Sequence, residues 1–262
     1  MIHNPLLMSS IPNIQHLAFL LLLGFAPSLI WLVYYLRQDL HPEPKKMIVR
    51  VFISGFFFTF FAFVAEWAFT KTFFQIDVLC SNCLQLAPNF YHSMNVSQVA
   101  ALSFSVIFGL SAIEEGSKYL AAKSRIINSM DFDEPVDAMI YMIVAALGFA
   151  AAENIGYILQ NSDNALNIAY WRFLSATFLH TAASAIVGYF FAVSVIKQKH
   201  HFFFIMLGLI IASLLHALFN FLIITAGVFQ HTAVSLLGLI IVLFCIVAFL
   251  FHRIKKMSFD IR

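Results

Sequence analysis

The chain of 262 residues is 61% hydrophobic and 16% aromatic, but only 11% of its residues are charged. A soluble domain carries about 25% charged residues, so this chain lacks the charge for a water-facing surface and is a membrane protein. The formal net charge of +2, without any basic stripe interleaved with aromatic residues, argues against binding of nucleic acid.

Apolar runs recur along the chain at about 20 residues, the length that crosses a bilayer core as a helix. The first run is too long for a signal peptide and lacks a basic segment before it, so we expect it to be retained. The sequence predicts an all-α, polytopic transmembrane bundle formed by a single domain over residues 1–262. The seven expected spans are residues 15–36, 49–69, 98–121, 136–159, 171–196, 202–225 and 232–252.

The basic residues predict the orientation of the bundle, because Lys and Arg concentrate on the cytoplasmic side of membrane proteins. All of them except Lys71 and Arg172 fall on one side of the expected spans. This asymmetry places the amino terminus outside and the carboxyl terminus in the cytoplasm. We therefore expect a multi-pass protein of the cell (cytoplasmic) membrane.

The longest segment between spans, about residues 70–97, is then extracytoplasmic and contains Cys80 and Cys83. A single Cys-x-x-Cys pattern without a second pair or a histidine is weak evidence for zinc. In an oxidising compartment it is more typical of a local disulfide or of two unreactive thiols, and we favour that interpretation.

The third expected span carries charges where lipid makes them costly. Glu114 and Glu115 are adjacent, and Lys118 follows four residues after the first. An ionisable group near the bilayer centre costs roughly 2.5–3.5 kcal/mol or more, and it usually faces an interior cavity. Residues i and i+4 share a helix face, so we expect Lys118 to hold Glu114 and leave Glu115 available. A helix end emerging into water is the alternative.

Three later spans add polar groups of the same kind. Glu153 lies well inside the fourth, His180 lies in the fifth, and the sixth places His216 and Asn220 on one face. One histidine on an apolar helix is commonly a satisfied core residue, but two on successive helices, together with buried carboxylates, favour a site. By depth, Glu114 meets the other residues if its helix enters the membrane nearer residue 103 than residue 98.

Two schemes for hydrolysis of an amide bond fit these residues. Two imidazoles and one or two carboxylates form the usual ligand set of a catalytic zinc that retains an open position for water. We expect Glu153, His180 and His216 to be the ligands, and Glu114, Glu115, Lys118 and Asn220 to be the catalytic groups. In a metal-free scheme, a desolvated glutamate acts as the base and Asn220 donates to the oxyanion.

The ordered motifs resemble those of the PrsW family of intramembrane proteases, which is related to the CAAX-prenyl endopeptidases. They are found between about residues 27 and 220, and single motifs are common by chance, whereas the ordered set is specific. The matching segments are Tyr35-Leu-Arg37-Gln-Asp39-Leu-His-Pro42-Glu43-Pro44, Glu114-Glu115-x-x-Lys118, Asp133-Glu134-Pro135-Val-Asp137, Gly148-Phe149-x-x-x-Glu153-Asn154, His180 and His216-x-x-x-Asn220.

The resemblance implies a bacterial membrane protease that has its site within the bilayer and cuts membrane-anchored proteins, such as an anti-sigma factor near its extracytoplasmic side. It implies that Glu114, Glu115, Glu153, His180 and His216 form the site, with Asn220 in support. An ion- or proton-coupled transporter is the competing interpretation, since transporters also retain charged residues in their spans. The paired, interrupted halves typical of transporters are not evident here. A non-catalytic membrane scaffold is the third possibility.

Overall fold

The computed structural model describes residues 14–38, 41–83, 96–126, 129–198, 200–225 and 232–261, with side chains described outside 73–83, 96–103, 232–233 and 258–261. Within these residues all regular structure is helical, as predicted. The elements are α1 (Ile14–Leu36), α2 (Lys45–Cys83), α4 (Val96–Ile126), α5 (Pro135–Gln160), the 3-10 helix η1 (Ser162–Asn164), α6 (Ala165–Leu174), α7 (Ala176–Lys197), α8 (His201–Thr225) and α9 (Thr232–Ile261).

Six of the described helical segments are long and apolar enough to cross a membrane: 14–36, 45–72, 135–160, 162–197, 201–225 and 234–257. Helix α4 runs beside them and carries Glu114, Glu115 and Lys118. The predicted polytopic helical bundle is therefore confirmed. Helix α2 continues through Cys83, so part of the segment expected to be a loop is helical. The side chains of Cys80 and Cys83, and residue Asp39, lie outside the described residues.

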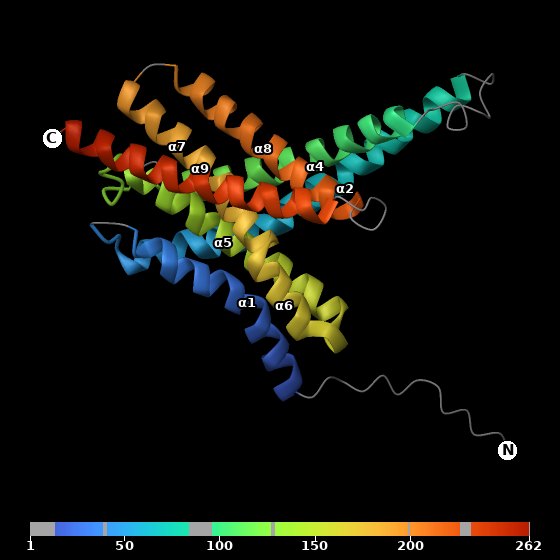
Figure 1. Ribbon diagram of the computed structural model, residues 1–262, viewed down its shortest axis with the longest axis horizontal. Helices are drawn as coiled ribbons and strands as arrows, with labels where there is room; N and C mark the ends of the chain where they lie inside the picture. Colours follow the sequence, from blue (N-terminus) through green and yellow to red (C-terminus); the bar gives the residue numbers. More distant parts are fainter. Residues whose placement is uncertain are drawn as a thin grey trace.

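Helix α5 is the centre of the bundle (Figure 1). In its apolar window 89% of the residues are buried, against 22% in α1 and 17% in the last span. Its sequence from Val136 to Ala151 is buried throughout and rich in alanine, so neighbouring helices approach its backbone closely. Helices α1, α2, α4 and α7 all pack against it.

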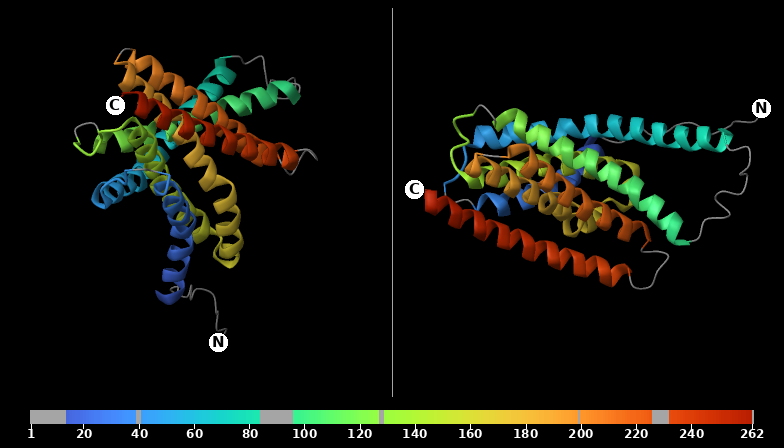
Figure 2. Two further views of the ribbon diagram at one scale, coloured as in Figure 1. Left: turned by 60° about the vertical axis from the view of Figure 1, so that its left-hand side comes forward. Right: turned by 90° about the horizontal axis from the view of Figure 1, so that it is seen from above.

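Glycines allow α2 and α5 to cross in direct backbone contact. A Cβ atom at Gly55 would overlap the carbonyl group of Ala145, and one at Gly148 would overlap that of Phe52. Beyond this crossing the helices diverge, α2 alongside α4 and α5 alongside α6 (Figures 1 and 2). The close approach of α2 and α5 is thus confined to one part of their length.

The start of α5 is fixed by polar contacts at the end of the bundle that we predict to be cytoplasmic. The Asp137 carboxylate accepts hydrogen bonds from the backbone N–H of Glu134 at 2.6 Å and of Asp133 at 3.0 Å, which satisfies donors that a helix start leaves unpaired. The Tyr141 hydroxyl donates to Glu43, so the Pro-Glu-Pro turn is tethered to α5. Oxygens of Glu43, Asp133 and Asp137 lie within 4.8 Å of one another, but these contacts give them a structural role.

The fifth expected span, residues 171–196, differs from the structure, because it is broken at Ser175 into the end of α6 and the whole of α7. Ser175 has φ −120° and ψ −79°, outside the helical region. Its hydroxyl donates to the Trp171 carbonyl at 2.7 Å, and such a bond to the preceding turn bends helices. Apolar periodicity does not reveal this break, because the residues on both sides of it are largely apolar.

We expect substitution of Gly148 by alanine to destabilise the bundle by about 1–3 kcal/mol, because the added methyl group meets the α2 backbone and the core is overpacked. Unfolding by SDS in mixed micelles measures the change. Gly238 on α9 is the matched control, since a Cβ there meets nothing within 4 Å, and Gly238→Ala should change stability by no more than about 0.5 kcal/mol. Equal stability of the two variants would show that the crossing is looser than described.

Candidate active site

Helix α4 places a fully buried ion pair at the centre of the site. The Lys118 ammonium lies 2.8 Å from Glu115 Oε1 and 3.4 Å from Glu114 Oε2, and both Glu115 and Lys118 have 0% exposure. The lysine is therefore closer to Glu115 than to Glu114, the reverse of the expected pairing. Positions i and i+3 also share a helix face, and the more deeply buried carboxylate has the greater need of a counter-charge.

Helix α7 brings His180 between Lys118 and Glu153. Its Nδ1 atom lies 2.7 Å from Lys118 Nζ, and its Nε2 atom lies 2.9 Å from Glu153 Oε2 on α5. An ammonium group only donates hydrogen bonds, so Nδ1 accepts. The proton of the neutral ring is then on Nε2, which donates to Glu153.

Helix α8 brings His216 beside the Glu114 oxygen that His180 also faces, with the two rings 5.1 Å apart. Its Nδ1 atom lies 2.8 Å from Glu115 Oε1, and its Nε2 atom lies 3.7 Å from Glu114 Oε2. With Glu115 as acceptor, Nδ1 carries the proton and the Nε2 lone pair faces Glu114. The hydroxyl of Ser184 donates to the other Glu115 oxygen at 3.3 Å, so both oxygens of that carboxylate are bonded.

Three of these residues have the arrangement of a possible metal centre. Glu114, His180 and His216 each offer a ligand atom, and the three atoms lie within 4.8 Å of one another. Glu114 Oε2 is 3.7 Å from His216 Nε2 and 3.9 Å from His180 Nδ1. Glu153 approaches His180 from the opposite ring nitrogen. The structure thus brings together Glu114, Glu115, Lys118, Glu153, His180 and His216.

An arginine pairs with Glu153 on its side away from the histidine. Arg172 on α6 donates to Glu153 Oε2 at 3.0 Å and also to the Asn154 side-chain oxygen. Its guanidinium lies 4.2 Å from the centre of the Tyr157 ring. Arg172 is therefore a counter-ion of Glu153. Within the cluster, three carboxylates face two permanent cations, which leaves one negative charge in excess.

Asn220 lies one turn beyond His216 on α8 and is half-buried. Within the described residues no hydrogen bond is recorded for its side chain, so the structure places it near the cluster without joining it to the network.

Glu66 on α2 is a polar residue that the sequence interpretation missed. It is half-buried and borders the same cavity as Glu153. The rule that identified the other carboxylates, an acidic residue inside an otherwise apolar span, also applies to it. Glu66 falls close to the predicted end of its span, where a charged side chain can reach the membrane surface and is less costly.

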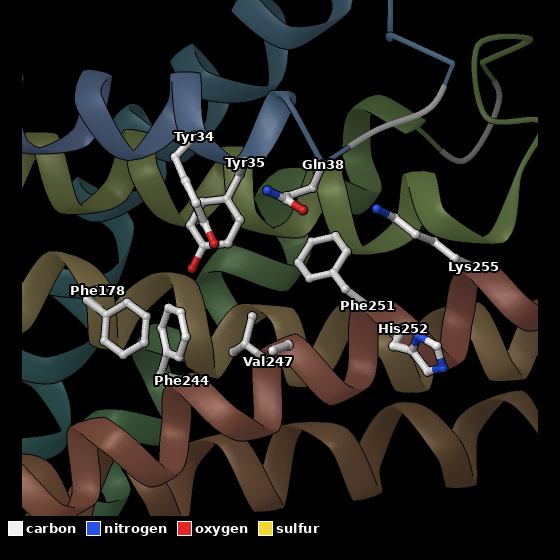
Figure 3. Close-up of a pocket in the computed structure, with 10 residues that line it drawn as sticks. Tyr34, Tyr35, Gln38, Phe178, Phe244, Val247, Phe251, His252 and Lys255 are labelled. Atoms are coloured by element: carbon white, nitrogen blue, oxygen red, sulfur yellow. The ribbon is translucent and has the colours of Figure 1, made fainter.

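Two cavities lie near the cluster, on different sides of the bundle. The larger, about 780 Å³, lies between α2 and α5, and both Glu66 and Glu153 line it. The smaller, about 260 Å³, is lined by side chains of α1, α7 and α9, with Phe178 at one end and Lys255 at the other (Figure 3). The hydroxyl of Tyr35 in its lining bonds Thr181 at 3.0 Å. Only the larger cavity includes a residue of the cluster in its lining.

The family model for the PrsW family intramembrane metalloprotease matches residues 43–251 of the chain. That range contains every member of the polar cluster and most of the described bundle. The chain belongs to the PrsW family. It is accordingly an intramembrane protease, a multi-pass membrane hydrolase, as the motifs predict. The transporter and scaffold interpretations are set aside by this membership.

Individual PrsW proteases are also similar in sequence to this chain over more than half of its length. Protease PrsW of Geobacillus kaustophilus is 26% identical over 200 residues, which cover 76% of this chain and 77% of that protein. Protease PrsW of Clostridioides difficile is 32% identical over 160 residues, covering 57% and 65%. Protease PrsW of Bacillus subtilis is 25% identical over 202 residues, covering 76% and 80%. No solved structure matches the chain.

For this PrsW-family protease we expect Glu115→Leu to lower the stability of the bundle by about 3–5 kcal/mol, because Lys118 then remains as a poorly compensated buried charge. The double variant Glu115→Leu, Lys118→Met should recover much of this loss, since both charges are removed together. Unfolding by SDS of the single and double variants measures the coupling. Simple additivity would contradict the ion pair.

Proposed function

We propose that the protease is zinc-dependent and hydrolyses a peptide bond of a membrane-anchored protein in the cell membrane. The observation that carries this proposal is the convergence of two imidazole nitrogens and one carboxylate oxygen from three helices. The His180 nitrogen accepts from Lys118 in this structure, and an ion would take the place of that ammonium. Each ring also donates its other N–H to a separate carboxylate, Glu153 for His180 and Glu115 for His216. Histidines that bind metals almost always have such an outer acceptor, which fixes the tautomer and the ring orientation.

We assign Glu114, His180 and His216 as the zinc ligands. Ligand atoms about 2.0–2.2 Å from a tetrahedral zinc lie about 3.3–3.6 Å from one another, close to the 3.7 and 3.9 Å between Glu114 Oε2 and the two ring nitrogens. Glu153, expected from the sequence to be a ligand, lies behind His180 and is assigned as its orienting partner. Bound zinc supplies acidification of water and polarisation of the scissile carbonyl.

The remaining residues position these groups and transfer the proton. During hydrolysis the water oxygen adds to the carbonyl carbon, the C–N bond breaks, and the amine takes up a proton. Glu115 has both oxygens bonded, so it is poorly placed to accept one. Glu153 faces the larger cavity with 22% exposure, but it bonds the far nitrogen of His180 and so lies beyond hydrogen-bond reach of water at the proposed ligands. It orients the ring, and the proton transfer is assigned to Lys118, which lies 3.4 Å from Glu114 Oε2. Asn220 is the proposed donor to the oxyanion.

The metal-free scheme remains as the alternative and has its own base. The contacts of the Glu114 carboxylate with Lys118, His180 and His216 are all 3.4 Å or longer. The Glu115 and Glu153 carboxylates, in contrast, accept hydrogen bonds of 3.0 Å or less. In that scheme Glu114 takes the proton of the water, and His216 orients it. Both schemes give the same products, so only the metal distinguishes them.

We further propose an anti-sigma factor as the substrate, on the basis of the family resemblance. Cleavage is followed by co-expressing the protease with a tagged anti-sigma factor that has one membrane span. The shortened tagged fragment is detected by immunoblotting of the membrane and soluble fractions.

We expect His216→Ala to reduce cleavage by about a hundredfold or more, since both schemes lose a group in contact with the reacting atoms. The purified variant should also lose the zinc that elemental analysis detects in the parent protein. His201→Ala on the same helix is the matched control, because His201 is exposed at the start of α8. Full cleavage by His216→Ala would contradict the site.

Chelation separates the zinc scheme from the metal-free scheme. We expect a chelator to abolish cleavage in detergent solution and added zinc to restore it, because without the ion no group would acidify the water and polarise the scissile carbonyl. A parent protein that contains no zinc and resists the chelator, while Glu114→Gln is inactive, would establish Glu114 as the base instead.

A further inference from the structure

The cavity between α2 and α5 follows from the way these helices cross. At Gly55 and Gly148 their backbones touch, and on one side of this point they diverge (Figure 1). The lining begins near the crossing with Phe56 and Phe149 and continues along both helices to Gln160. A wedge-shaped groove of about 780 Å³ results, within the range of sites that bind substrates and other ligands.

The groove faces the lipid on its outer side. Phe60 and Phe63 on its α2 wall are each 66% exposed, and in a membrane such side chains contact acyl chains. On the opposite wall Ala152 and Gly156 lie one helical turn apart on α5, with Tyr157 beside them, and a Cβ at Gly156 would meet nothing within 4 Å. A chain can therefore approach the α5 backbone closely from the bilayer.

The groove carries polar side chains among its apolar ones. Glu66 projects from α2, Glu153 and Gln160 come from α5, and Glu153 bonds directly to His180. No hydrogen bond or ion pair joins the Glu66 side chain to another described residue. A lipid acyl chain has no atoms that can form hydrogen bonds with these side chains. A peptide bond can be attacked only where a helix is unwound, and the N–H and C=O groups freed there need partners in the bilayer.

We infer that this groove receives the membrane segment of the substrate laterally from the lipid, with a short unwound stretch whose backbone N–H groups bond Glu66 and Gln160. The inference rests on the proposed function, because it presumes a membrane-anchored substrate. The unwound stretch lies along Ala152 and Gly156 and carries small side chains there. Its scissile bond lies at the end of the groove where Phe149 contacts His180 and Lys118.

The test fills the groove without altering the cluster. We expect Gly156→Leu to reduce cleavage of the tagged anti-sigma factor by about tenfold to a hundredfold, because the added side chain displaces the substrate backbone from its position. Its zinc content and its resistance to unfolding by SDS should equal those of the parent. Gly238→Leu on α9 is the matched control, since that glycine is equally uncrowded and lies outside the groove; it should cleave at the parental rate.

A second measurement does not depend on activity. A photo-crosslinking amino acid in place of Phe63, in the Glu114→Gln background, should capture the tagged substrate, whereas the same group at Phe249 on α9, which is also exposed to lipid, should capture only lipid. If the parent protein cleaves and Gly156→Leu cleaves equally well, or if Phe249 captures as much substrate as Phe63, the groove is not the substrate path. Failure of the parent protein to cleave would instead reject the proposed function.

Discussion

The arrangement of the bundle depends on the burial of Glu115 and Lys118 in an apolar interior. Neither charge can be left unpaired, because an isolated ion in such surroundings costs several kcal/mol. Lys118 bonds to His180 on α7, and Glu115 bonds to His216 on α8 and to Ser184 on α7. Satisfying one pair on α4 therefore determines how two other helices lie. At the candidate active site, the packing of α4 against α7 and α8 and the pairing of the buried charges both favour the same positions of these helices.

A second constraint comes from small residues rather than charges. Glycine and alanine let α2 and α7 reach the backbone of α5, so the central helix is enclosed along its first two thirds. Toward Gln160 the same helix borders the groove. Close packing at one end and separation at the other allow a rigid scaffold and an accessible site within a single pair of helices.

Much of this organisation follows from the sequence alone. Spans are long apolar runs, so hydropathy locates them, and Glu114, Glu153, His180 and His216 are conspicuous because lipid disfavours them. The break at Ser175 is hidden, since it depends on one local hydrogen bond. The preference of Lys118 for Glu115, and the place of Glu153 behind His180, depend on helix rotation and tilt. The apolar pattern of a sequence fixes the rotation of a helix only to within about one residue. That uncertainty is enough to exchange the positions of the adjacent Glu114 and Glu115.

The contact between Lys118 and His180 has a consequence for the order of assembly. The ammonium group lies at 2.7 Å from the ring nitrogen that faces Glu114, and it also balances the carboxylates on α4. Many small metal-binding domains remain unfolded until the ion arrives, because their ligands repel one another without it. Here the chain supplies its own internal counter-ion. The helices can therefore associate in the membrane without an ion, and under the proposed zinc scheme loading with metal would exchange one cation for another in a bundle that is already formed.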